Sequence, residues 1–301
     1  FDGPLLQESQ QLALQRSATS TAKGKLLMFG VTALLFLVVG GLWMSWQFVP
    51  VLLAVIALHE GGHYLAMKLT GYRNVSVFFL PGLGGLATGE KAAATPFEKL
   101  FVYLAGPIPG IALAGLAFWA ASAGVWVGPS WLNEFLIASL LINYLNLLPV
   151  VPLDGGRVVE TLLFARHPRL RFAFAALCCA LLFAAGLYVD DWVLRLVAVL
   201  VAFGLPGQWR LMRLDQAIDR MPGQAFEEPQ AIRQILRALQ QARFRDWSFV
   251  RRSQAVSALL PELMGRRAAL GEAVAGLLIY LAVLVGPIAA VLVAMPQLGQ
   301  V

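Results

Sequence analysis

Charged residues are scarce in this sequence. Asp, Glu, Lys and Arg make up 13% of its 301 residues, whereas hydrophobic residues make up 59%. A soluble domain is about one-quarter charged, and several apolar stretches here approach the roughly 20 residues that cross a bilayer as a helix. The composition therefore excludes an ordinary soluble protein and predicts a polytopic helical membrane protein.

Cysteine and histidine are also rare. The two cysteines, Cys178 and Cys179, are adjacent in an apolar segment, and this spacing excludes a disulfide framework and a CxxC metal motif. We interpret them as small buried helix residues. A metal site would therefore use nitrogen and oxygen ligands, and the chain has three histidines to supply the nitrogen.

Positive charge is in excess, with a formal net charge of +6. Nucleic-acid binding is the weaker interpretation, because the basic residues are scattered through the predicted loops. With the N-terminus inside, Arg195 is the one residue of the 23 Lys and Arg that falls near the outer side. Cytoplasmic loops of membrane proteins are enriched in these residues, so we predict a cytoplasmic N-terminus in a multi-pass protein of the cell (inner) membrane.

The apolar pattern predicts an all-α polytopic membrane protein with about seven transmembrane helices, at roughly 26–46, 48–69, 98–124, 131–153, 172–189, 192–211 and 272–295. Two prolines in the third of these spans, Pro107 and Pro109, predict a kink there. We divide the chain into an N-terminal polar segment (1–25), a first transmembrane helix (26–47), a core of three transmembrane helices (48–165), two further transmembrane helices (166–211), a soluble cytoplasmic helical segment (212–270), and a last transmembrane helix with a C-terminal tail (271–301).

Residues 74–92 have a different pattern. Val75, Val77 and Phe79 alternate with other residues, and a Pro- and Gly-rich turn follows at 80–85. This pattern predicts a short β-hairpin at the inner membrane surface, with a bare loop as the alternative. An exposed strand edge could accept an unwound peptide as an added strand.

The soluble segment 212–270 carries two amphipathic patterns. Ala231–Phe244 forms the first, and Trp247–Leu260 forms the second, which we expect Pro261 to end. The segment has a local net charge of +4 and could lie on anionic lipid. A partner-binding regulatory role, a substrate-docking role and a passive connecting role all remain open.

One pentapeptide, His59-Glu60-Gly61-Gly62-His63, lies inside an apolar run long enough to be embedded in the membrane. Positions i and i+4 share one face of a helix, so the two imidazoles can converge on one metal ion. The glutamate between them can reach a metal-bound water as a general base. Ionisable residues inside a membrane are costly and usually functional, which favours a metal site over a pair of helix-packing histidines.

A second polar cluster, Asn143 to Arg157, ends the predicted fourth span. Pro149 and Pro152 break the helix, and two glycines after Asp154 free the backbone so that its carboxylate can turn inward. The predicted topology puts Asp154 and His63 at similar depths near the cytoplasmic side. Two histidines and one carboxylate would leave a fourth position for water, as a catalytic zinc site requires; a helix-end cap is the alternative role for Asp154.

With both clusters considered, the chain resembles the site-2 protease family of intramembrane zinc metalloproteases. The resemblance covers roughly residues 48–165 and rests on the HExxH helix, on Leu104-Ala105-Gly106-Pro107, and on the run from Asn146 to Gly156. It implies that 48–165 is a metalloprotease core, that Zn²⁺ is bound by His59, His63 and Asp154, and that Glu60 is the catalytic base. It also implies transmembrane protein substrates in a lipid bilayer, with Asn146 as a substrate-positioning or oxyanion-stabilising residue.

Two other functions are compatible with these residues. Intramembrane His and Asp also line ion paths, so a membrane metal-ion transporter is one alternative. Against it, the polar groups gather at one predicted depth rather than in a file across the bilayer. A proteolytically silent relative that acts as a binding protein is the other alternative, and the intact Glu60 weighs against it.

Overall fold

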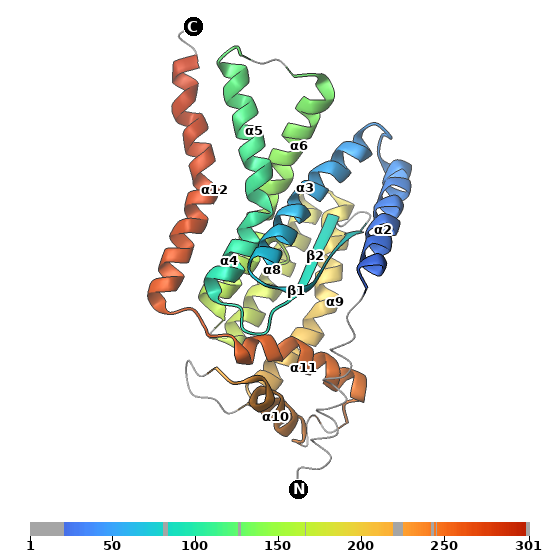
Figure 1. Ribbon diagram of the computed structural model, residues 1–301, viewed down its shortest axis with the longest axis vertical. Coiled ribbons are helices and arrows are strands. Elements are labelled where there is room, and N and C mark those ends of the chain that lie inside the picture. The colour runs from blue at the N-terminus through green and yellow to red at the C-terminus, as the bar shows by residue number, and fades with distance from the viewer. Residues whose placement is uncertain are drawn as a thin grey trace. The chain divides into compact units, whose positions relative to one another are not determined.

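The computed structural model describes residues 21–80, 84–125, 128–165, 167–218, 225–241, 244 and 246–298 (Figure 1). Most of the predicted N-terminal polar segment, 1–25, and the tip of the predicted hairpin, 81–83, lie outside these residues. The chain divides into two compact units. The metal-site unit comprises 22–90, 97–162 and 270–301; the helical unit comprises 1–21, 91–96 and 163–269.

The metal-site unit is built around one helix, α3. It contains α2 (Ala22–Trp43), α3 (Phe48–Leu69), α4 (Pro96–Ala105), α5 (Pro107–Ser122), α6 (Ser130–Asn146), α7 (Asp154–Val159), the start of a π-helix, η1 (Glu160–Phe164), and α12 (Leu270–Leu298). Helix α3 contacts α2, α5 and α6 and both strands of a small sheet, and Figure 1 shows it between α2 and the pair α5–α6. The helix that carries the HExxH sequence is therefore the central element of this unit.

The predicted hairpin is present. Strands β1 (Arg73–Leu80) and β2 (Gly84–Glu90) pair antiparallel, with Phe79 opposite Gly85. The ring of Phe79 is buried against Phe29 and Phe36 of α2, with ring centroids 5.2 and 6.4 Å away. Burying an aromatic side chain contributes about 1.5–3 kcal/mol, so α2 anchors β1 and leaves β2 next to α3.

Helices α4 and α5 meet at a bend of 44°. The break falls at Gly106, next to Pro107 and close to Pro109. A proline inside a helix removes one hydrogen bond and clashes with the preceding turn, so the kink that the sequence predicts in this span is confirmed.

The predicted fourth span, 131–153, is wrong at its C-terminal end. Helix α6 ends at Asn146 and has 17 residues, which gives a length of about 25 Å. Residues before a proline disfavour the helical conformation, and Pro149 and Pro152 follow soon after the helix ends. The chain then turns and begins a new short helix at Asp154.

The helical unit contains α8 (Pro168–Tyr188), α9 (Trp192–Asp215), α10 (Glu228–Leu239) and α11 (Phe249–Met264). Apolar residues of α10, α11 and the end of α9 form one buried cluster, which includes Ile235, Leu236, Leu259 and Leu260. The expectation that Pro261 ends the last of these helices is wrong, because α11 continues to Met264. Pro261 removes one helical hydrogen bond. Ending the helix at Pro261 would displace the fully buried Leu263, which would cost more, so the helix continues.

Five described helices are long and apolar enough to cross a membrane, or six if α4 and α5 form one bent span. Seven spans were predicted. The one outside this number is α6, which ends about two turns before its predicted range does and is therefore shorter than the others. The predicted polytopic α-helical membrane fold with a small antiparallel sheet is confirmed.

Candidate metal centre

Helix α3 brings His59, Glu60 and His63 to one buried site. Their exposed fractions are 5%, 5% and 7%, although most of the helix is apolar. The two imidazole rings are four residues apart, so they lie one turn from each other on the same face, with centroids 4.7 Å apart.

The segment after α6 folds back to bring Asp154 to the same place. Asp154 is the first residue of α7 and is 8% exposed. Gly155 and Gly156 pack directly on the backbone of 147–151, where the Cβ of any other residue would collide. The carbonyl of Leu147 accepts a hydrogen bond from the Tyr280 hydroxyl of α12. The two glycines therefore allow the close turn that points the carboxylate inward.

Three ligand atoms form a nearly equilateral triangle. The Nε2 atoms of His59 and His63 are 3.1 Å apart, and each lies 3.2 Å from Oδ2 of Asp154. Four ligands in a tetrahedron at about 2.0–2.1 Å from zinc lie about 3.3–3.4 Å from one another. The triangle therefore has nearly the size of one face of a tetrahedral zinc site.

Hydrogen bonds on the far side of each ring fix which nitrogen faces this triangle. Nδ1 of His63 lies 2.7 Å from the carbonyl oxygen of Val102, which can only accept. Nδ1 of His59 lies 2.8 Å from Oδ1 of Asn143, whose Nδ2 donates to the Ser139 carbonyl. Both Nδ1 atoms are thus donors, and a neutral imidazole then has a bare lone pair on Nε2.

Two nitrogen lone pairs and one carboxylate oxygen therefore face one another in a buried site. Such an arrangement is repulsive unless a cation lies between the three atoms. His59, His63 and Asp154 are also the one group of three His, Cys, Asp or Glu residues with metal-binding geometry among the described residues. The donor set fits a zinc ion, which binds imidazole nitrogen and carboxylate oxygen.

Glu60 lies beside the triangle rather than in it. The backbone N–H of Ala87 in β2 donates to its carboxylate. Gly85 of the same strand packs so closely on Glu60 that a Cβ would collide with its side chain. Strand β2 thus holds this carboxylate next to the candidate metal position, where it can accept and return a proton.

The site opens into a cleft of about 390 Å³. Its walls include residues 85–89 of β2, together with Tyr72, Asn146 and Arg157. Burial and the neighbouring Tyr103 and Glu98 raise the pKa of Tyr72 to about 12, so its hydroxyl stays a hydrogen-bond donor at neutral pH.

The structure brings His59, Glu60, His63 and Asp154 together and puts Asn146 on the cleft wall. The side-chain amide of Asn146 donates to the Ile142 carbonyl of its own helix. Sequence reasoning assigned no role to Asn143, which is fully buried and contacts His59. An Asn one turn before Asn146 in an apolar helix was the available signal, because buried polar groups in membranes usually have a partner.

Part of this chain is similar in sequence to known proteins. Residues 47–129 match the model of Peptidase family M50. Stage IV sporulation protein FB of Bacillus subtilis is 32% identical over 155 residues, which cover 48% of this chain and 53% of that protein. Zinc metalloprotease MJ0392 of Methanocaldococcus jannaschii is 26% identical over 197 residues, or 62% and 57% of the two chains.

The resemblance to the site-2 protease family is confirmed. The M50 match includes α3 with His59, Glu60 and His63, whereas Asp154 lies beyond it. This chain spans about half the length of the two curated relatives described above. Among solved structures, the site-2 protease from Methanocaldococcus jannaschii aligns with a TM-score of 0.44 and 24% identity, over 59% of this chain and 88% of that one.

Proposed function

We propose that this chain is an intramembrane zinc metalloendopeptidase that cleaves peptide bonds within or next to transmembrane segments of other membrane proteins. The observation that carries the proposal is the buried triangle of two bare imidazole nitrogens and one carboxylate, with Glu60 beside it. Three protein ligands leave a fourth zinc position for water or substrate, as a catalytic rather than structural site requires.

In this proposal, each side chain has one task. When bound, zinc supplies a Lewis acid that activates water and polarises the scissile carbonyl. His59, His63 and Asp154 hold the ion, and Asn143 and the Val102 carbonyl orient the two rings. Glu60 takes a proton from the attacking water and later gives it to the leaving nitrogen. Asn146, on the cleft wall, positions the substrate or stabilises the developing oxyanion.

The hairpin supplies a route for substrate. The two-stranded sheet leaves one edge of β2 without a strand partner among the described residues, and residues 85–89 of that strand line the cleft. An unwound substrate segment can add to such an edge as a new strand. Unwinding is necessary, because a helix hides its peptide bonds from attack.

The proposed setting is the cell (inner) membrane, with the N-terminus and the active-site end on the cytoplasmic side. The sequence distribution of Lys and Arg supports this orientation. Residues 212–270 would then be cytoplasmic and available to a regulatory partner.

Proteolysis by purified protein tests the proposal. The full chain, loaded with one equivalent of zinc in detergent, is incubated with membrane-protein substrates as the wild type and as Glu60→Gln. The variant keeps the size of the side chain and the three zinc ligands but removes the base. We expect unchanged zinc content and cleavage slower by about 10²–10⁴-fold, the usual contribution of a general base. Equal cleavage by both proteins, or no cleavage by zinc-loaded wild type, would reject the proposal.

Metal transport is not favoured. In the described structure, the three candidate ligands converge on one position. Transport would be favoured over proteolysis if zinc entered proteoliposomes containing the wild type and Asp154→Ala abolished this flux. A silent relative that only binds would show no turnover in the wild type, and the Glu60→Gln variant would then behave no differently from it.

A further inference from the structure

A second cavity lies in the helical unit, formed by residues of α9, α11 and the segment before α11. It has a volume of about 240 Å³ and is lined by Gly207, Arg210, Leu211, Trp247, Arg251, Gln254 and Ala255. Two of these residues are cationic and none is acidic. The cavity is smaller than the roughly 300–1,000 Å³ of sites for drug-sized ligands, so it suits a compact anionic group.

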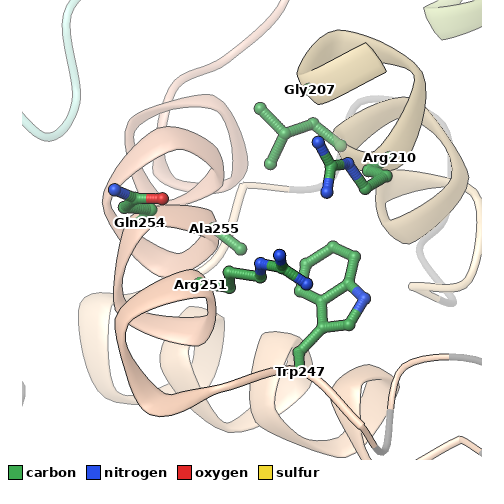
Figure 2. Close-up of a pocket in the computed structure, with 7 residues that line it drawn as sticks. Gly207, Arg210, Trp247, Arg251, Gln254 and Ala255 are labelled. Carbon is green, nitrogen blue, oxygen red and sulfur yellow. The ribbon is translucent and has the colours of Figure 1, made fainter.

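Two arginine side chains line this cavity. Figure 2 shows the side chain of Arg251 reaching the indole of Trp247 and that of Arg210 extending from the other helix toward the same space, whereas Gln254 points away from them. The Nε of Arg210 donates to the Pro206 carbonyl at 3.0 Å, which orients the side chain and leaves its terminal nitrogens for a ligand. Arg251 has no hydrogen bond or ion pair with another residue in the described part of the chain.

Three contacts hold Trp247 in place. Trp247 packs against the apolar cluster of α10 and α11, and its ring meets Phe244 edge-on with centroids 5.3 Å apart. The Nε of Arg252 donates to the Trp247 carbonyl at 3.1 Å. The indole is thus a fixed apolar floor beneath two cations that repel each other until an anion lies between them.

The position of the cavity along α9 indicates where its ligand comes from. Helix α9 is a candidate membrane span, and Gly207, Arg210 and Leu211 lie in its C-terminal part. The exposed Trp209 stands next to Arg210. Exposed Trp and Arg at the end of an apolar helix are typical of the membrane–water interface, where lipid phosphates lie.

We propose that this cavity is a binding site for a phosphate group, supplied by the headgroup of an anionic phospholipid. Arg210 and Arg251 donate to the phosphate oxygens, for which the planar guanidinium is well suited. The apolar face of Trp247 lies against the glycerol portion. The site is separate from the proposed proteolytic centre, and its assignment does not depend on proteolysis.

Titration of the full chain in detergent with phosphatidylglycerol, followed by native mass spectrometry, tests this site. The wild type is compared with R210Q/R251Q and with R233Q/R237Q, which removes two exposed arginines of α10 that do not line the cavity. The two double variants have the same net charge. We expect the wild type to bind one lipid saturably. R210Q/R251Q should weaken this binding about tenfold or more, because charge-assisted hydrogen bonds to the phosphate are lost. R233Q/R237Q should bind the lipid as the wild type does.

Three outcomes would overturn the proposal. Equal weakening by both double variants would mean general attraction to basic residues, and unchanged binding in both would mean that the cavity is not the site. If glycerol phosphate competes for the cavity as well as the lipid does, the cavity binds phosphate but the lipid is not its source. Arg251→Glu is a further check, because an acid in the cavity must weaken lipid binding more than Arg251→Gln does; failure of that order would also count against the site.

Discussion

In the metal-site unit, the interior around α3 contains His59, Glu60, His63, Asn143 and Asp154, all of them buried. The interior between α10 and α11 in the helical unit consists of Leu, Ile, Val, Ala and Phe. Burial of polar groups without partners costs free energy, whereas apolar burial provides it. The first interior is therefore arranged for a ligand, and the second is arranged for stability.

In the metal-site unit, glycines allow helices to pack closely around the candidate ligands. Gly62 of α3 lies against the Ala105 carbonyl, and Gly106 lies against the ring of His63, so closely that a Cβ would collide in both cases. Close backbone approach through small residues is how membrane helices pack. Here the close approach also fixes the position of a candidate metal ligand, so packing and chemistry cannot be varied separately in this unit.

Asp154→Ala is expected to have the largest effect. It removes the one anionic ligand and leaves two imidazoles that hold zinc weakly. We expect zinc content near zero and cleavage reduced by about 10³-fold or more, which corresponds to about 4 kcal/mol of lost transition-state stabilisation. Zinc is measured by mass spectrometry of the purified protein. Asp246→Ala, at an exposed carboxylate of the helical unit, is the control, and a wild-type zinc content in Asp154→Ala would refute the assignment.

Leu260→Ala tests the other interior. Leu260 is fully buried in the apolar cluster, so truncation should lower the free energy of unfolding by about 2–5 kcal/mol, seen as a lower midpoint in thermal unfolding. Val250→Ala, at a side chain of the same helix that is 63% exposed, should change it by about 0.5 kcal/mol or less. Zinc content below the unfolding midpoint should stay at one equivalent. Loss of zinc from folded Leu260→Ala would contradict the contrast between the two interiors.

Gly106→Ala should disturb the metal centre through packing alone. The added methyl group would meet the His63 ring, and overpacking of this kind costs about 1–3 kcal/mol. We expect weaker zinc binding and slower cleavage. Gly115→Ala, in the helix that follows Gly106, is a matched control, because a Cβ there meets nothing within 4 Å. If the two variants behave alike, Gly106 does not position His63.

Local patterns predicted a large part of this structure. The i, i+4 spacing of His59 and His63 fixes their common face on any helix. Alternating side chains and a Gly-rich turn predicted the hairpin, and the glycines after Asp154 predicted an inward-turning carboxylate. These features depend on a few neighbouring residues, so one sequence is enough to find them.

Features that depend on distant contacts were missed or misplaced. The end of α11 is set by burial of Leu263 against other helices. This burial outweighs the tendency of Pro261 to end the helix, which is all that the local sequence shows. The ring of His59 meets Asn143, 84 residues later in the chain, and nothing in either neighbourhood specifies that pairing. The predicted role of Asn146 stays a prediction, because its side chain bonds to its own helix.

Replacing Asn143 and Asn146 in turn should distinguish their roles. Asn143→Leu keeps a similar volume but removes the oxygen that accepts from Nδ1 of His59, so the ring loses its fixed orientation. Loss of such a partner usually weakens metal binding by about 10–100-fold. We expect this loss in a competition assay with a chelator, and we expect excess zinc to restore cleavage. Asn146→Leu should instead keep the zinc affinity and slow cleavage at saturating zinc, because its side chain lies on the cleft wall. If both variants lose zinc equally, the loss reflects damage to α6, and Asn143 has no specific role in orienting His59.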